Sequence, residues 1–270
     1  MDEQLELLER TELKEQNVLK EHERIDDLQL GGLRIIQDPK GFCFGIDAVL
    51  LSNFIKLKPK DQVVEFGTGT GIIPILLTGK TTFNKIHAFE VQHDVAEMAE
   101  RSVRLNNLSE KIEIIEDNLT ESNKYFDSGT IDVVFSNPPY MSGEGGIKND
   151  HTLKAISRHE VLCSLEDIIA NASRLLKHRG KFYMIHRPNR LVDIVALCRQ
   201  YKLEPKEIRM IQPYFDKRPN IFLIMCSKGG QSDLKFLDPL IVYEKDGSYT
   251  AEIHDIYGME NITVFKRDVK

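Results

Sequence analysis

The sequence predicts an α/β fold: one doubly wound, mainly parallel sheet of seven strands covered by helices. From residue 62 onward, short apolar runs alternate with longer amphipathic stretches of helical spacing. Strands that alternate with helices are typical of a parallel sheet buried on both faces. The runs expected to be strands are 62–66, 85–90, 112–116, 131–136, 181–186, 208–212 and 221–226, and the expected helices are 72–79, 94–106, 165–177 and 190–201.

Three further segments surround this alternation. Residues 1–24 are acidic and predict a helical or disordered arm, and residues 25–230 are expected to form the main domain. Near its start, a short strand of a hairpin is expected at 33–36 and a helix at 47–55, with Asp47 as its candidate N-cap. In the tail, 231–270, the stretches 240–243 and 249–253 flank Asp246-Gly247, which predicts a C-terminal β-hairpin.

The composition is that of a globular protein. Hydrophobic residues make up 41% of the 270 residues, which is enough to form a buried core. No run of about 20 apolar residues is present, so we expect no membrane span, and the acidic start is unlike a secretory leader. The four cysteines form no CxxC pair. We therefore expect reduced thiols, no metal site and a cytoplasmic location. We also expect a monomer or a weak homodimer.

Charge is unevenly distributed along the chain. The net charge is −6, and residues 1–27, with ten acids and four bases, account for all of it. Residues 177–218 instead hold eleven Lys and Arg against four Asp and Glu. A local basic surface suits phosphate binding even in an acidic protein. Ordinary solvated helix faces would give the same composition.

A glycine loop follows the first strand of the alternation. Residues 67–71 read Gly-Thr-Gly-Thr-Gly and lead directly into a helix. Glycines let the backbone turn tightly and approach a ligand closely. The dinucleotide fingerprint is GxGxxG, whereas Ile72 follows Gly71 here, which argues against a nicotinamide or flavin cofactor. A strand-to-helix turn without a ligand is the alternative.

Polar residues close the next two strands. Glu90 ends the strand 85–90, and Asp117 and Asn118 follow the strand 112–116. A carboxylate at the position of Glu90 can accept hydrogen bonds from both hydroxyls of a ribose. Asp117 can accept a hydrogen bond from an adenine amine. Each acid alone would suit a solvated strand end, but together they predict an adenosine lying across this edge of the sheet.

The most specific motif is Asn137-Pro138-Pro139-Tyr140, directly after the strand 131–136. The prolines stiffen the chain and fix the side chains around them. The Asn137 amide oxygen and the Pro138 carbonyl are then two neighbouring acceptors, beside the aromatic face of Tyr140. An exocyclic adenine amine is a poor nucleophile. Accepting both of its hydrogens would pull the nitrogen toward tetrahedral geometry and point its lone pair at a methyl donor.

The glycine loop, Glu90, Asp117 and the Asn-Pro-Pro-Tyr motif, in this order, resemble a class I amino-methyltransferase over about residues 25–230. The resemblance implies a Rossmann-like methyltransferase sheet with S-adenosylmethionine as cofactor. It implies that Gly67, Thr68 and Gly69 face the methionine part, Glu90 the ribose and Asp117 the adenine. The expected cofactor-binding residues are Glu65, Gly67, Thr68, Gly69, Gly71, Glu90, Asp117, Asn118 and Asn137, and the expected catalytic residues are Asn137, Pro138 and Tyr140.

Flanking segments narrow the resemblance. They are similar to the bacterial tRNA1(Val) adenine-37 N6-methyltransferases at Ile25-Asp26-Asp27-Leu28, residues 41–48, Ser157-Arg158-His159-Glu160 and residues 186–191. This implies methylation of an adenine next to the anticodon of a tRNA. The residues expected to contact RNA are Pro139, Tyr140, Arg187, Arg190, Lys217 and Arg218. The acidic stretch before residue 24 departs from the family pattern.

Three other functions stay open at this point. The same four-residue motif serves protein glutamine methyltransferases, because a glutamine amide is also planar. Those enzymes usually carry a helical N-terminal domain, whereas only about 60 residues precede the glycine loop here. A different base in rRNA or DNA is the second alternative. A non-catalytic nucleotide- or RNA-binding module is the third, and Asn137 and Tyr140 argue against it.

Overall fold

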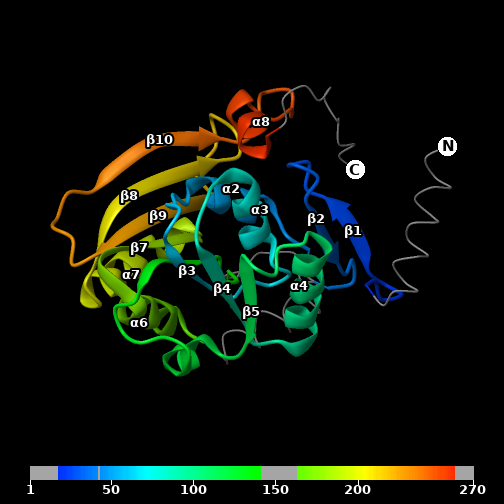
Figure 1. The fold of residues 1–270 in the computed structure, drawn as a ribbon. Coiled ribbons are helices and arrows are strands. Elements are labelled where there is room, and N and C mark those ends of the chain that lie inside the picture. Colours follow the sequence, from blue (N-terminus) through cyan, green and yellow to red (C-terminus); the bar gives the residue numbers. More distant parts are fainter. Residues whose placement is uncertain (1–17, 42, 141–162, 259–270) are drawn as a thin grey trace.

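The computed structural model describes residues 18–41, 43–140 and 163–258 (Figure 1). In chain order its elements are β1 (Arg24–Asp27), β2 (Arg34–Gln37), α2 (Ile46–Phe54), β3 (Gln62–Phe66), α3 (Ile72–Lys80), β4 (Lys85–Glu90), α4 (His93–Leu105), β5 (Ile112–Glu116), η1 (Leu119–Lys124), β6 (Ile131–Ser136), α6 (Leu165–Leu175), β7 (Leu176–His186), η2 (Pro188–Arg190), α7 (Leu191–Gln200), β8 (Leu203–Gln212), β9 (Ile221–Lys228), β10 (Lys235–Ile241) and α8 (Ala251–Tyr257).

The main sheet has the order β10-β8-β9-β7-β6-β3-β4-β5. All neighbouring strands are parallel except those that pair with β9. From β3 the chain builds outward to β5, then returns to the other side of β3 and continues with β6 and β7. The order therefore reverses between β3 and β6, where ligands of doubly wound sheets bind. The predicted fold class is confirmed.

Helices cover both faces of this sheet. Side chains of α2, α3 and α8 share one apolar core with alternate strand residues such as Val63 and Val133. Side chains of α6 and α7 share the other core with the intervening residues, such as Val64 and Val134. The period-2 alternation explains why neighbouring residues of a buried strand supply opposite cores.

The number of strands differs from the prediction. The sheet has eight strands, because β10 pairs in parallel with the outer edge of β8. Its register shifts between Leu237 and Leu240, around Pro239. Proline cannot donate to a ladder, but an edge strand tolerates it at a bulge. The run KFLDPLI therefore forms a strand in spite of its proline.

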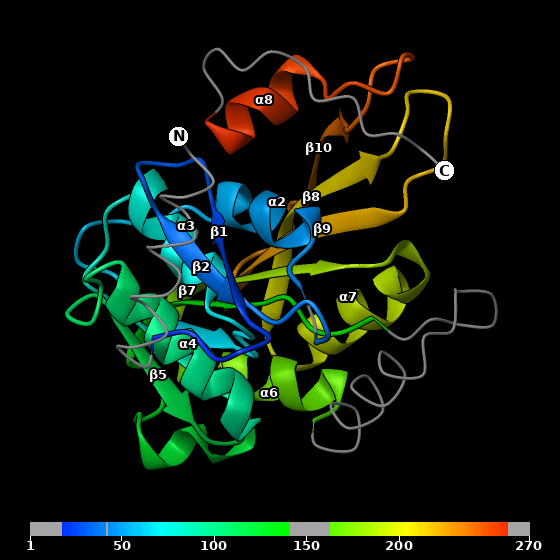
Figure 2. The same cartoon turned by 90° about the vertical axis from the view of Figure 1, so that its right-hand side faces the viewer.

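The predicted C-terminal hairpin is wrong in its second arm. Around Asp246-Gly247 only one bridge forms, between Tyr243 and Tyr249. The chain then enters α8, where the Thr250 side chain accepts a hydrogen bond from the Ile253 N–H. Ile253 and Ile256 are buried on one side of this helix, which packs beside α2 (Figure 2). Their spacing of three suits a helix, and burial of that face decides between helix and strand.

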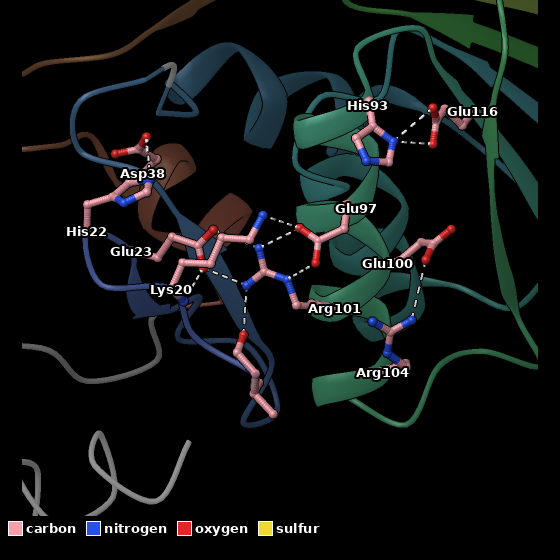
Figure 3. A network of polar contacts seen from close by, with 11 residues as sticks. Lys20, His22, Glu23, Asp38, His93, Glu97, Glu100, Arg101, Arg104 and Glu116 are labelled. Atoms are coloured by element: carbon pink, nitrogen blue, oxygen red, sulfur yellow. Dashed lines mark hydrogen bonds and ion pairs between the residues drawn. The ribbon is translucent and has the colours of Figure 1, made fainter. Parts of the chain in front are cut away.

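Hydrogen bonds join the N-terminal hairpin of β1 and β2 to α4. The Asn106 side chain bonds both backbone groups of Arg34, and the Ser102 hydroxyl accepts the Ile36 N–H at 3.1 Å. Beside them, the Arg101 guanidinium holds the Glu23 and Glu97 carboxylates (Figure 3). These contacts fix the chain that leads into α2.

Helix α2 begins differently from the prediction. Its N-cap is Gly45, which provides no side-chain cap, and Asp47 lies inside the first turn. Asp47 is therefore not the cap, and its carboxylate is used elsewhere. Across the described parts of the chain, no helix combines the length and apolar character needed to cross a bilayer.

Candidate functional site

The glycine loop lies at the switch point of the sheet and rests on the end of β4. The N–H groups of Gly67 and Thr68 both donate to the Phe89 carbonyl, at 3.0 and 2.9 Å. The Gly69 N–H donates to Glu90 Oε2 at 3.0 Å. Gly67 and Gly69 have positive φ angles of 73° and 58°, and a Cβ at either would meet no atom within 4 Å. Glycine allows this conformation without strain, and the loop leaves open space in front of its backbone.

Two buried polar groups beside the loop lack partners within the described chain. They are the Glu65 carboxylate, at the end of β3, and the Thr68 hydroxyl. The pKa of Glu65 is raised to about 8, chiefly by burial. The nearby Thr68 side chain lowers this pKa in part, and the Glu90 charge contributes to raising it. A cationic ligand would compensate a buried carboxylate. S-adenosylmethionine carries a sulfonium and an ammonium group, so these residues fit it.

A cavity brings together the acids that close the neighbouring strands. Its lining includes Gly67, Phe89, Glu90, Asp117 and Asn118. Glu90 is buried, and its Oε1 accepts the N–H groups of the two residues that follow it, each at 3.0 Å. Four of the expected cofactor residues therefore share one cavity at the carboxyl edge of the sheet.

Asp117 is held as an ionised acceptor. Its Oδ1 accepts the Asn118 N–H at 2.7 Å, and its Oδ2 accepts the Tyr125 hydroxyl at 3.0 Å. These hydrogen bonds, the first of them above all, keep the pKa of Asp117 below its ordinary value. Asn118 instead caps η1, because its side chain accepts the Thr120 N–H.

The Asn-Pro-Pro-Tyr motif extends from β6, on the other side of the switch point. The Tyr140 hydroxyl is 3.2 Å from Asn137 Oδ1, to which it donates a hydrogen bond. The Asp47 carboxylate of α2 lies nearby. Burial raises the pKa of Tyr140 well above 10, and the Asp47 charge adds to this, so the phenol stays protonated. Asn137 Oδ1 has two lone pairs, so it can accept from a second donor as well.

Three residues around Tyr140 complete its surroundings. The Arg187 guanidinium lies over the ring, 4.9 Å from its centroid, and the His186 ring meets it edge-on at 5.2 Å. Burial lowers the pKa of His186 to about 4, so this ring is neutral at pH 7. Burial also raises the pKa of Asp47, although Tyr140 and Arg187 lower it in part. Sequence reasoning gave Asp47 and His186 no role at the site, because helix α2 and strand β7 meet Tyr140 only in the folded chain.

The expected RNA contacts lie at the same edge of the sheet. Pro139 is exposed, and Lys217 and Arg218 are exposed in the loop between β8 and β9. Arg187 donates to the Asn220 carbonyl at 3.0 Å, and Arg190 pairs with Asp193 at 2.8 Å. Ser157-Arg158-His159-Glu160, one of the segments that carry the resemblance, lies outside the described residues.

Comparisons with known proteins identify the family of this chain. A family model described as the methyltransferase small domain matches residues 42–193, more than half of the chain. A Porphyromonas gingivalis protein named tRNA1(Val) (adenine(37)-N6)-methyltransferase is 25% identical over 219 residues, which cover 77% of this chain and 84% of that protein. A Pedobacter heparinus protein of the same name is 26% identical, covering 67% of this chain and 74% of its own.

Among solved structures, a predicted O-methyltransferase from Agrobacterium tumefaciens is similar in fold. Its TM-score is 0.63 at 23% sequence identity, covering 83% of this chain and 100% of the other. At that identity the likeness shows the fold alone, and the family comes from the matched model. The chain belongs to the methyltransferase small domain family and is an S-adenosylmethionine-dependent methyltransferase.

Proposed function

We propose that this enzyme methylates the exocyclic N6 of an adenine in RNA, A37 of tRNA1(Val), in the cytoplasm. The observation that carries the proposal is the placement of Asn137 and Tyr140 across the switch point from the cavity of Gly67, Glu90 and Asp117. A planar amine held at the motif would face a methyl donor held at the cavity. The names of the Porphyromonas and Pedobacter relatives support the adenine and the tRNA.

The cofactor would lie along the loop and the two strand ends. Gly67, Thr68, Gly69 and Gly71 would border its methionine part. Glu90 would accept from the ribose hydroxyls, and Asp117 and Asn118 would meet the adenine. Glu65 lies beside the loop, where a bound cationic ligand would favour its ionised form. The bound cofactor supplies an electrophilic methyl group on sulfur.

The chain's own contribution is to hold the amine. Asn137 Oδ1 and the Pro138 carbonyl would accept the two N6 hydrogens, while Tyr140 and Pro139 border the base. Tyr140 donates its hydroxyl hydrogen to Asn137 Oδ1, so the phenol also fixes the orientation of the Asn137 amide. As N6 gains the methyl group it releases one of its two protons to water. The contribution of these acceptors is electrostatic preorganisation.

Transfer of a labelled methyl group tests the proposal. The protein is incubated with labelled S-adenosylmethionine and, separately, with total tRNA, rRNA, DNA and a protein fraction lacking N5-methylglutamine. Nucleoside analysis should find N6-methyladenosine in the tRNA fraction, and a tRNA1(Val) transcript with A37 replaced by guanosine should accept none. Label in the protein fraction alone, as methylglutamine, would replace this proposal with the glutamine alternative.

Salt dependence of RNA binding tests the basic edge. Replacing Arg190, Lys217 and Arg218 by alanine should reduce the slope of log affinity against log salt. The expected reduction is about one unit for each phosphate that is no longer neutralised. The matched control replaces Lys177, Arg179 and Lys181, which lie at the opposite end of β7. Filter binding of tRNA at several salt concentrations gives both slopes. Equal slopes for the two triple variants would contradict this assignment.

Stability against pH tests the buried carboxylate of Glu65. Its pKa is about 8 in the folded protein and has the ordinary value of 4.5 when the chain unfolds. Between these values the folded protein holds a proton that the unfolded chain has released, so the free energy of unfolding falls as pH rises toward 8. Glu65→Gln keeps the shape without titrating. The free energy of unfolding of this variant should fall less steeply with rising pH than that of the wild type. The difference in slope should be up to about 1.4 kcal/mol per pH unit. Urea unfolding without cofactor measures both profiles, and parallel profiles would rule out the raised pKa.

A further inference from the structure

The loop between β8 and β9 carries an exposed aromatic ring at the catalytic edge. Strands β6, β7 and β8 run in the same direction in the sheet, so the chain after β8 emerges at the same edge as Asn137 and Arg187. In this loop Phe215 is 83% exposed, and Lys217 and Arg218 are exposed beside it. A phenylalanine this exposed, close to two cations of the same loop, needs an explanation, because its exposure to water is unfavourable.

The loop is ordered, so the exposure of Phe215 is built into the fold. The Lys217 N–H donates to the Tyr214 carbonyl at 3.0 Å, and the Gln212 side chain donates to the Lys217 carbonyl at 2.8 Å. The Tyr214 ring packs against the Tyr243 ring, with centroids 5.5 Å apart. Tyr214 therefore points toward the protein and its neighbour Phe215 points into solvent.

Arg187 connects this loop to the catalytic motif. Arg187 covers the Tyr140 ring, 4.9 Å from its centroid, and its Nη1 donates to the Asn220 carbonyl at 3.0 Å. Asn220 ends the loop, where its N–H donates to the Ile211 carbonyl at 3.1 Å. Arg187 thus connects the loop that carries Phe215 to the ring of the catalytic tyrosine.

We infer that Phe215 stacks on an unpaired base of the substrate RNA, next to the target adenine, while Lys217 and Arg218 contact the flanking phosphates. This inference rests on the proposed function and specifies how its substrate is held. Sequence-specific RNA recognition uses splayed single-stranded bases stacked on aromatic side chains, with cations along the backbone. An RNA whose target adenine leaves its stack exposes the faces of the neighbouring bases, and these would cover Phe215. An apolar protein side chain would not require the adjacent cations.

The test compares Phe215→Ala with Phe215→Trp and a matched control. Loss of one base–aromatic stack should raise the KM for an anticodon stem-loop RNA about tenfold or more, with kcat little changed. Tryptophan keeps a stacking face and should restore the KM. The control is Phe236→Ala: Phe236 is 65% exposed, but it lies near the start of β10, away from the catalytic edge. Both side chains are exposed, so neither truncation should unfold the protein.

A second readout locates the stacked base. With 2-aminopurine at the position beside the target adenine, wild-type protein should quench its fluorescence, Phe215→Ala should not, and Phe236→Ala should behave as wild type. If wild type methylates the RNA and Phe215→Ala matches Phe236→Ala in KM and quenching, this inference is overturned and the proposed function stands. If wild type methylates no RNA, both are overturned.

Discussion

Replacing Asn137 by alanine is expected to lower kcat and kcat/KM together by about a hundredfold or more, with S-adenosylmethionine affinity little changed. In the proposed mechanism its Oδ1 accepts a hydrogen from the target amine, and this interaction strengthens as the nitrogen becomes tetrahedral. The glycine loop, Glu90 and Asp117 lie across the switch point and do not depend on this side chain. Steady-state kinetics with tRNA measure the first effect, and calorimetry with the cofactor measures the second.

Two further variants separate the roles within the motif. Asn137→Asp keeps an acceptor of similar shape but places a second carboxylate near the Tyr140 hydroxyl, in addition to that of Asp47. We expect it to remain strongly impaired. Tyr140→Phe keeps the aromatic face and removes only the hydroxyl, so it should retain much of the activity. If Asn137→Ala methylates adenine at the wild-type rate with the cofactor bound normally, the amide is not the catalytic acceptor.

The largest expected effect on stability comes from Glu23→Ala. The Glu23 and Arg101 side chains are 1% and 4% exposed, and two hydrogen bonds of 2.5 and 2.6 Å join them. Removing one partner of such a pair leaves the other charge buried and costs about 3 to 5 kcal/mol. Glu97 still faces Arg101, so we expect a loss near the lower limit, about 3 kcal/mol. Urea unfolding at neutral pH measures it.

Acid unfolding provides the control for this pair. Burial by itself would raise the pKa of Glu23. The hydrogen bond from Arg101 and the other contacts of the Glu23 carboxylate outweigh burial, so the pKa lies below its ordinary value of 4.5. The stabilisation is therefore present above pH 4.5 and is lost as pH falls below it, and Glu23→Ala should show less of this acid dependence. Lys20→Ala removes only an exposed pair with Glu97 and should cost under about 1 kcal/mol. Equal losses for the two variants would show that Glu23 and Arg101 do not form a buried pair.

Much of the fold could be predicted because its signals are local. The strands at 62–66, 85–90, 112–116 and 131–136 agree with the structure residue for residue. Each is a short apolar run that a parallel sheet buries on both faces, and a helix with its own apolar face follows or precedes it. The roles of the site residues stay predictions. The sequence nevertheless indicated that Gly67, Glu90, Asp117 and Asn137 would lie along one edge of the sheet, because carboxyl ends of parallel strands share one edge.

Other features depended on contacts between distant segments. The tail contains a good turn sequence at Asp246-Gly247, but it does not form the predicted hairpin. Its first part pairs with the open edge of β8 as a strand, and its last part packs beside α2 as a helix. Glu23 and Arg101 form a buried pair although 78 residues separate them. Asp47 reaches Tyr140, and Arg187 joins Tyr140 to the loop of Phe215. The sequence alone determined the strands, the glycine loop and the Asn-Pro-Pro-Tyr motif, since each is specified by neighbouring residues. Only the tertiary structure decided which side chains meet across elements, because those contacts depend on packing that no local pattern records.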